Sequence, residues 1–242
     1  MQTLNYQGIK ILPKTQLKTE DALVIEAPLQ ININNKPYPV VMRTPGNEIE
    51  LVRGLLFAED IYKQEAVFRF EVIEVKKGGE TIVNISIPEE MLGKGYLNKR
   101  TLLSVSSCGI CGKQELKDLV VSGDTIDLKN AMAASNIQKM FALMQAHQKT
   151  FKKSGGSHAA ALFNANNTLL SIQEDIGRHN AVDKVVGELL LKKQLKEATF
   201  MLVSGRVSYE IVSKAFIAKI PIIVAVSACS SLAVDFSKEF GI

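Results

Sequence analysis

Hydrophobic and polar residues change their spacing about halfway along the chain. In the first hundred residues, apolar and polar positions alternate over short runs, as in Leu29-Gln-Ile31-Asn-Ile33, and this spacing predicts strands. Asn34-Asn35 is a predicted turn. Further predicted strands cover residues 38–42, 68–75 and 81–87, and a helix opened by Thr44-Pro45 presents Ile49, Val52, Leu55 and Leu56 on one face. The first part of the chain is therefore expected to form a small sheet with one helix.

The second half begins with a helical pattern over residues 135–153, which Gly155-Gly156 is expected to end. Strand and helix patterns then alternate: strands 158–163, 169–173, 199–203 and 222–226, and helices 181–193, 209–219 and 232–240. Such alternation with short loops predicts an α/β layer with at least partly parallel strands. We place a domain boundary between residues 112 and 113, giving an N-terminal domain 1–112 and an α/β domain 113–242, α+β overall.

Composition narrows the class of protein but not its function. The 242 residues, at about 150 per domain, suit one large or two small domains. With 46% apolar residues and a net charge of +4, the chain is not expected to be disordered. The longest apolar run, residues 220–226, is far shorter than the roughly 20 residues of a membrane span, and no secretory leader is visible. Three cysteines favour a reducing, cytoplasmic compartment, and 29 basic against 25 acidic residues give no reason to expect nucleic acid.

Cys108 and Cys111 form a CxxC pair within Ser-Ser-Cys-Gly-Ile-Cys-Gly. This spacing serves half of a zinc site, a thioredoxin-like dithiol, or a nucleophile that carries sulfur. The second CxxC of a zinc site and the early strand of a thioredoxin unit are both missing from the pattern. Glycine flanks suit a thiolate loop better than core packing, and Lys113 and Lys117 could lower a thiol pKa. Spacing alone leaves these alternatives open.

Four polar loops fall where the pattern places strand ends or helix starts. Gly155-Gly156 and Gly205 allow a phosphate to approach backbone N–H groups, and Arg178 and Arg206 offer planar donors for phosphate or carboxylate. In open α/β sheets, ligands bind at such loops. The four loops are residues 154–158, 174–180, 204–206 and 227–231.

Each loop also has a purely structural interpretation. Ser154-Gly-Gly would be a helix C-cap, and Asn180 and Ser230-Ser231 would be N-caps. His158 and His179 could be hydrogen-bonded structural imidazoles. Glu174 and Asp175 have a functional alternative, general acid–base chemistry, but no histidine–serine order stands out beside them. No P-loop or dinucleotide fingerprint is present, and His158-Ala-Ala with an upstream CxxC does not fit a zinc deaminase.

Taken together, these segments resemble the FdhD family, the formate dehydrogenase accessory sulfurtransferases. The run Asp-Ile-Gly-Arg-His-Asn-Ala-Val-Asp-Lys, residues 175–184, is the most specific match. The other matching stretches are residues 42–46, 54–60, 107–111, 155–163, 204–206, 222–228 and 230–235.

The resemblance implies a sulfurtransferase that takes a persulfide sulfur from a cysteine desulfurase and passes it to the molybdenum cofactor. This cofactor, in its bis-guanine dinucleotide form, would then enter formate dehydrogenase, and guanine nucleotides could mimic it. The implied fold is a cytidine-deaminase-like three-layer domain with a smaller N-terminal mixed α/β domain, as a cytoplasmic homodimer. Cys108 would carry the persulfide and Cys111 would assist. The implied cofactor-binding residues are Gly155, Gly156, His158, Asp175, Gly177, Arg178, His179, Asn180, Asp183, Lys184, Ser204, Gly205 and Arg206.

Two other functions compete with sulfur transfer. One is a cofactor-binding chaperone for formate dehydrogenase maturation whose cysteines do no chemistry, and the other is a zinc-stabilised structural protein. The sequence departs from the family pattern at Cys229, where the resemblance leads us to expect a proline before Ser230. The family pattern also continues, beyond the position of Ile242, through another strand and an arginine-containing segment.

Overall fold

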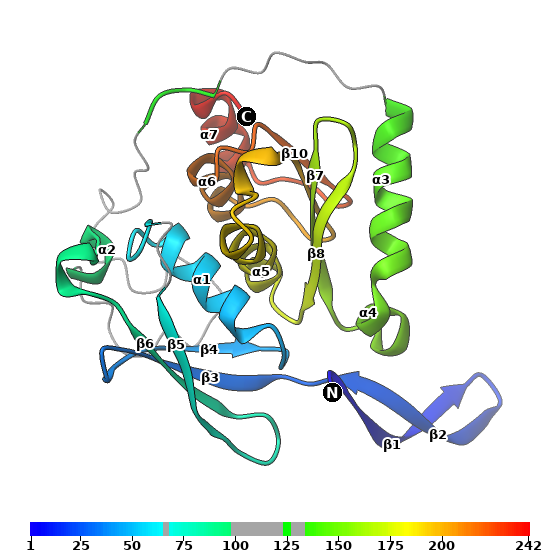
Figure 1. Cartoon of the computed structure of the whole chain (residues 1–242). Helices are drawn as coiled ribbons and strands as arrows, with labels where there is room; N and C mark the ends of the chain where they lie inside the picture. Colours follow the sequence, from blue (N-terminus) through cyan, green and yellow to red (C-terminus); the bar gives the residue numbers. More distant parts are fainter. Residues whose placement is uncertain (65–67, 98–122, 127–133) are drawn as a thin grey trace.

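The computed structural model describes residues 1–64, 68–97, 123–126 and 134–242. Within them the chain forms two four-stranded sheets and a separate two-stranded hairpin, with helices packed on the sheets (Figure 1). The mixed α+β class is as predicted. The predicted domain boundary, between residues 112 and 113, lies outside the described residues. No helix of the described part is long and apolar enough to cross a membrane.

The N-terminal sheet has the strand order β4-β3-β6-β5. It consists of β3 (Ala27–Ile33), β4 (Lys36–Arg43), β5 (Arg69–Val75) and β6 (Thr81–Ser86), with β3 and β6 parallel and the other pairs antiparallel. Helix α1 (Glu48–Ala58) covers one face and packs Leu51, Val52 and Leu56 against Ile31 and Val83. The predicted helix and strands are therefore present. The short helices η1 (Glu89–Met91) and α2 (Lys94–Leu97) follow β6.

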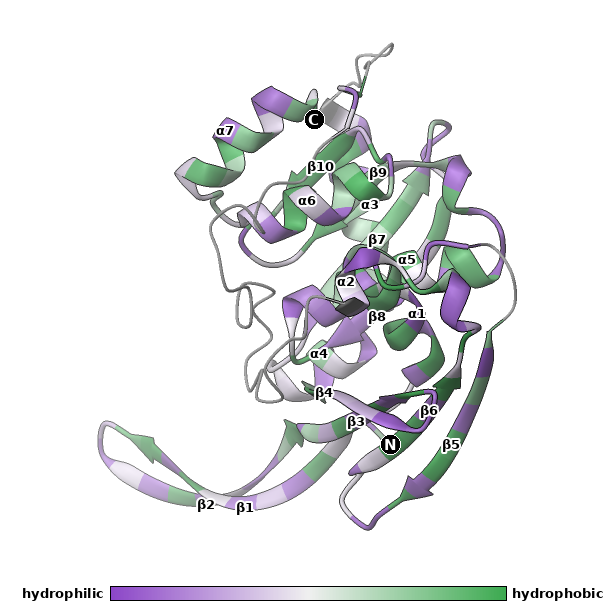
Figure 2. Ribbon diagram, turned by 90° about the vertical axis from the view of Figure 1, so that its left-hand side faces the viewer, coloured by the Kyte–Doolittle hydropathy of each residue, from purple (hydrophilic) through white to green (hydrophobic). Residues whose placement is uncertain are grey.

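A hairpin precedes this sheet and was not predicted. Strands β1 (Thr3–Leu12) and β2 (Thr15–Val24) pair along their whole length and project from the body (Figures 1 and 2). We call residues 3–24 the arm. The base of the arm is fixed where the Gln2 side chain accepts a hydrogen bond from the Thr150 hydroxyl at 2.6 Å.

The C-terminal sheet has the order β10-β9-β7-β8 and forms the middle of three layers. One face, including Leu162 and Met201, packs on α5 and α6, whereas the other, including Phe163 and Leu202, packs on α3. Strands β9 and β10 are parallel, and β7 is antiparallel to β8 and β9. The elements are α3 (Ala134–His147), α4 (Lys149–Ser154), β7 (His158–Asn164), β8 (Leu169–Asp175), α5 (Arg178–Leu191), η3 (Leu195–Glu197), β9 (Ala198–Val203), α6 (Tyr209–Ile217), β10 (Ile222–Ala225) and α7 (Ser231–Phe240).

The two sheets are joined through the close packing of α1 on α5. A Cβ atom at Gly54 would lie 1.9 Å from the carbonyl oxygen of Asp183, and one at Gly187 would lie 1.8 Å from that of Glu50. Only glycine allows the two helix backbones to come this close. This contact holds α5, which carries five of the predicted cofactor-binding residues, against α1.

The single helix predicted over residues 135–153 is wrong, because the structure divides it into α3 and α4. The helical dihedrals stop at Gln148, where ψ is 76°. The Glu174 carboxylate accepts hydrogen bonds from the N–H groups of Thr150 and Phe151 at 2.8 and 2.7 Å, so that a residue of β8 caps the new helix. Gly155, in the left-handed region at φ 64°, ends α4 as the predicted C-cap.

Candidate functional site

The four predicted loops meet at one edge of the C-terminal sheet. His158 at the start of β7 pairs with Asp175 at the end of β8, and Val203 at the end of β9 pairs with Ala160 and Ala225. Helices α5, α6 and α7 each begin a few residues beyond these strand ends (Figure 1). We call this the loop edge. Three helix N-termini lie at this edge, and a helix N-terminus favours an anionic ligand.

The outer part of the loop edge is formed by His158, Arg178, Ser204 and Gly205. The Ser204 hydroxyl lies 3.4 Å from Nδ1 of His158 and accepts a hydrogen bond from the N–H of Ala159 at 2.9 Å. A Cβ atom at Gly205 would lie 3.3 Å from both Arg178 Cδ and His158 Nδ1. The glycine therefore lets the backbone lie against the side chains of both Arg178 and His158, and Arg178 remains half-buried beside it.

His158 is held in its neutral form. Burial is the main cause that lowers its pKa below the ordinary value, and the positive charge of Arg178 and the neighbouring His179 lower it further. The Asp175 carboxylate opposes this shift but does not reverse it. A neutral imidazole presents one N–H donor and one acceptor at the loop edge.

Beneath this outer part lies a buried ion pair from the same motif. The Lys184 ammonium is 2.7 Å from the Asp175 carboxylate, and both side chains are fully buried. Lys184 also donates to the carbonyl oxygen of Thr44 at 3.0 Å, and the Thr44 hydroxyl accepts from the N–H of Ile176 at 3.1 Å. The pair thus ties the segment before α1 to the start of α5.

Asn180 extends the same network and is not the predicted N-cap of α5. Gly177 occupies the N-cap position. The Asn180 side-chain amide donates to Asp175 at 2.9 Å and to the carbonyl oxygen of Met42 at 2.8 Å, while the N–H of Gly177 donates to Asp175 at 2.8 Å. The Asn180 side chain therefore serves a long-range contact instead of the helix end. The predicted N-cap at Ser230, by contrast, is confirmed, because its hydroxyl accepts from the N–H of Ala233 at 3.2 Å.

A second buried set links α5 to α6. His179 Nε2 lies 3.0 Å from the Glu210 carboxylate, and Asp183 pairs with Lys214 at 2.5 Å. The sequence analysis did not identify Glu210 and Lys214. A signal was available in the spacing. His179 and Asp183 are four residues apart on α5, as Glu210 and Lys214 are on α6, so each helix presents two polar side chains on one face.

The remaining predicted residues lie on the surface or beside it. Gly155 and Gly156 are exposed, and a Cβ at Gly156 would lie 2.9 Å from the Val24 side chain at the base of the arm. Arg206 is exposed directly after Gly205. Cys229 is also exposed at the loop edge, where it forms an isolated bridge with Val207. This is the predicted loop 227–231, so the placement of Cys229 after a strand end is as expected.

Cys108 and Cys111 lie outside the described residues. Among the residues that are described, no group of three or more His, Cys, Asp or Glu side chains is close enough to hold a metal ion.

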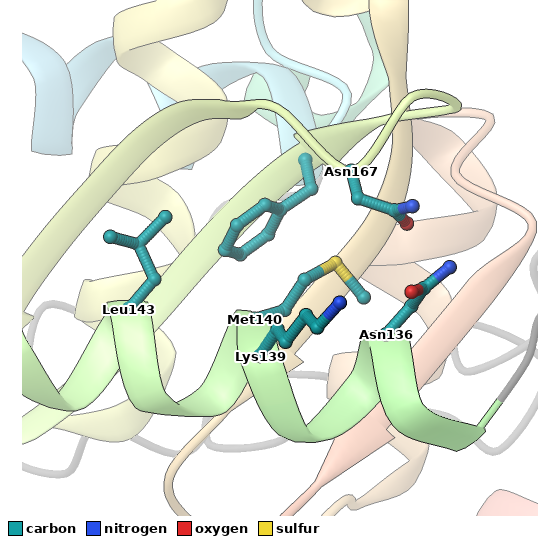
Figure 3. Close-up of a pocket in the computed structure, with 6 residues that line it drawn as sticks. Asn136, Lys139, Met140, Leu143 and Asn167 are labelled. Carbon is teal, nitrogen blue, oxygen red and sulfur yellow. The ribbon is translucent and has the colours of Figure 1, made fainter.

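A separate cavity of about 270 Å³ opens between α3 and the far end of β7 (Figure 3). The amide groups of Asn136 and Asn167 and the Lys139 amine surround its mouth, above Met140 and a phenylalanine ring (Figure 3). The phenylalanine, Phe163, is five residues along β7 from His158, or about 16 Å at 3.3 Å per residue. This cavity is therefore distinct from the loop edge.

The fold and the loop edge define a class: an α+β protein in which arginines, small residues and helix N-termini gather at the strand ends of a mixed sheet. Residues 24–242 match the family model of the FdhD/NarQ family, and the chain belongs to that family. The family assignment drawn from the motifs is thereby confirmed.

Individual relatives agree over nearly the whole chain. A protein of Nocardia farcinica named sulfur carrier protein FdhD is 37% identical over 245 residues, covering 99% of this chain and 88% of its own. A protein of Sulfolobus acidocaldarius with the same name is 37% identical, covering 100% of this chain and 91% of its own. A crystal structure from Desulfotalea psychrophila, described as that of a candidate formate dehydrogenase accessory protein, has a TM-score of 0.75 at 23% identity, covering 100% of this chain and 90% of its own. It shows the same fold.

Proposed function

We propose that this protein is a sulfur carrier that accepts a persulfide sulfur from a cysteine desulfurase and delivers it to the molybdenum cofactor for formate dehydrogenase. Family membership, and the name shared by relatives that align over nearly the whole chain, support the sulfur-carrier role. The gathering of four polar loops at one sheet edge is the structural observation that carries the cofactor part of the proposal. A cytoplasmic location and a cytidine-deaminase-like description of the three-layer domain belong to the same proposal.

The two cysteines would act in sequence. The Cys108 thiolate attacks the outer sulfur of the desulfurase persulfide, an S–S bond forms, and the desulfurase cysteine leaves as a thiolate. Cys111 then attacks the inner sulfur of the Cys108 persulfide, which forms a Cys108–Cys111 disulfide and releases hydrosulfide towards the acceptor. A cellular dithiol reductant restores both thiols. Gly109, between the two cysteines, and Gly112, directly after Cys111, would give the pair the backbone freedom that such a transfer needs.

The cofactor is cargo in this scheme, and the sulfur acceptor. Its guanine dinucleotide arms carry pyrophosphate, and the loop edge suits an anion because it brings the half-buried Arg178 and the exposed Arg206 to the strand ends. Arg178, Arg206, Ser204 and the backbone of Gly155 and Gly156 would hold these arms.

We assign a positioning role to the predicted residues that are buried. Their side chains are enclosed and already bonded within the protein, so they hold the loops rather than touch the cargo. These residues are Asp175, His179, Asn180, Asp183 and Lys184, together with the buried N-cap Gly177 and the buried Gly205.

An intact-mass assay tests sulfur transfer. The protein is incubated with a cysteine desulfurase and cysteine and weighed before and after a thiol reductant. The wild type should gain one reductant-labile sulfur atom, and Cys108→Ala should gain none. Cys229→Ser is the matched control, because Cys229 is an exposed thiol outside the CxxC pair, and it should gain sulfur like the wild type. A sulfur atom retained on Cys108→Ala would contradict the proposed carrier residue.

The chaperone alternative is tested by replacing both cysteines while the residues of the loop edge stay unchanged. It predicts that a Cys108→Ala, Cys111→Ala double variant still supports formate dehydrogenase maturation. The sulfur-carrier proposal predicts loss of maturation while binding of guanosine diphosphate stays unchanged. Retained maturation would decide for the chaperone.

A further inference from the structure

Glu174 is a charged residue of β8 to which the proposed function gives no role. It directly precedes Asp175, and its half-buried side chain reaches α4 and the loop that follows α4. The carboxylate accepts three hydrogen bonds from donors within the protein, at 2.7–2.8 Å. Both oxygens are therefore engaged inside the molecule, which favours a positioning role over general acid–base chemistry.

One oxygen of this carboxylate is bonded to both sides of the Gly155–Gly156 pair. Oε1 accepts a hydrogen bond from the N–H of Phe151 at 2.7 Å, and the Phe151 carbonyl oxygen accepts one from the N–H of Gly155 at 2.7 Å. On the other side of the two glycines, the same Oε1 accepts from the hydroxyl of the buried Ser157 at 2.8 Å. The loop between Phe151 and Ser157 is thus closed on a single oxygen of β8.

The second oxygen connects the start of α4 to the base of the arm. Oε2 accepts from the N–H of the buried Thr150 at 2.8 Å, and the Thr150 hydroxyl donates to the side chain of Gln2 at 2.6 Å. Val24, at the end of β2, lies against the same loop, because a Cβ atom at Gly156 would come within 2.9 Å of its side chain. The loop is therefore held between β8 and the base of the arm.

The backbone of Glu174 joins these contacts to the buried ion pair. Its carbonyl oxygen accepts from the Lys184 ammonium at 3.4 Å, and Asp175, the partner of Lys184, is the next residue along the chain. In the register of β7 and β8, Asp175 lies opposite His158, which directly follows Ser157. Glu174 therefore connects the fixed part of the motif to the loop that leads into His158.

We propose that Glu174 is a positioning residue of the loop edge, whose carboxylate holds residues 150–157 in the conformation that places Gly155, Gly156 and His158 beside the anionic cargo. The proposal rests on the anion site proposed above and adds to it a residue that acts only through the loop. Replacing such a residue should weaken binding although no group that contacts the ligand is removed.

Two substitutions of Glu174 test the proposal in the full-length protein. Glu174→Ala removes all three acceptor contacts, whereas Glu174→Gln keeps one acceptor oxygen. The dissociation constant of guanosine diphosphate should rise by about threefold or more in Glu174→Ala and by less in Glu174→Gln. Calorimetric titration measures it at a temperature at which every variant is folded. In the ligand-free protein, hydrogen–deuterium exchange at the amides of residues 150–157 should be about tenfold faster in Glu174→Ala.

Glu188→Ala is the matched control. The Glu188 carboxylate is also half-buried, and it accepts from three donors, the side chains of Ser171, Gln173 and Lys192. It lies ten residues along α5 from Arg178, or about 15 Å at 1.5 Å per residue. Glu188→Ala should therefore lower the melting temperature while leaving the affinity for guanosine diphosphate and the exchange of residues 150–157 unchanged.

Three results would overturn the proposal: unchanged affinity in Glu174→Ala, unchanged exchange of residues 150–157, or an equal loss of affinity in Glu188→Ala. A wild type that binds no guanosine diphosphate would instead contradict the proposed anion site. The exchange comparison then tests Glu174 by itself. Faster exchange confined to residues 150–157 would support its hold on the loop, and unchanged or uniformly faster exchange would refute it.

Discussion

The motif of residues 175–184 divides into a buried part and an outer part that differ in what surrounds them. Asp175 and Lys184 are fully buried and bonded to each other and to the segment before α1. Arg178, three residues after Asp175, is half-buried beside Gly205 and His158. One run of sequence therefore supplies both the support of the loop edge and the group that we propose faces the ligand. A motif match by itself does not distinguish these two roles.

Breaking the buried pair should give the largest effect. Lys184→Met removes the charge and leaves the Asp175 carboxylate buried beside an apolar chain, which should lower the free energy of unfolding by about 3–5 kcal/mol. Thermal or urea unfolding measures it. The control is Lys192→Met, which removes an exposed partner of Glu188 and should cost about 0–1 kcal/mol. Equal losses in the two variants would mean that the buried pair does not support the fold.

Disturbing the support of α5 should come next. Gly54→Ala places a Cβ within 1.9 Å of the Asp183 carbonyl, and the overpacking should cost about 1–3 kcal/mol or more. Gly8→Ala in the arm is a matched control, because its Cβ would meet only an ordinary contact at 3.8 Å. Urea unfolding of both variants should show a lower midpoint for Gly54→Ala alone. If the two midpoints agree, the close contact between α1 and α5 contributes little to the stability of the fold.

Removing an outer residue should affect binding and leave stability nearly unchanged. Arg178→Ala should weaken the binding of guanosine diphosphate by about 10- to 100-fold, because hydrogen bonds between charged groups contribute roughly 1.5–3 kcal/mol. Calorimetric titration measures the affinity, and Arg178→Lys should recover only part of it because the planar donor pair is lost. Wild-type affinity in Arg178→Ala would mean that guanosine diphosphate binds away from Arg178.

The pH dependence of His158 should be the smallest effect. Its pKa is lowered in the folded protein, so below about pH 6.5 the unfolded chain takes up the proton more readily and stability falls. Arg178, His179 and Asp175 are the charged groups that act on it. Between pH 7.5 and 5.5 the wild type should lose up to about 1 kcal/mol, and His158→Gln should lose less. Urea unfolding at both pH values gives the comparison, and parallel losses would rule out His158 as the cause.

The sequence predicted the local elements better than the contacts between them. Helices 209–217 and 231–240 were found to within two residues because their apolar positions repeat at the helical period. The break at Gln148 was missed because its cause, the Glu174 carboxylate, comes from another strand. The arm was missed because its strands have apolar residues on both faces and no covered side. The buried pairs were missed because Lys184 and Lys214 look like surface residues of a helix until their partners are placed.

Hydrogen–deuterium exchange with and without guanosine diphosphate tests the central claim most directly, because it locates the ligand on the unmodified protein. The account predicts protection of the backbone amides in residues 154–158, 176–180, 204–208 and 227–231, with none in the arm or β5. Protection confined to the cavity beneath α3, at Asn136, Lys139 and Phe163, would contradict the assignment of the loop edge.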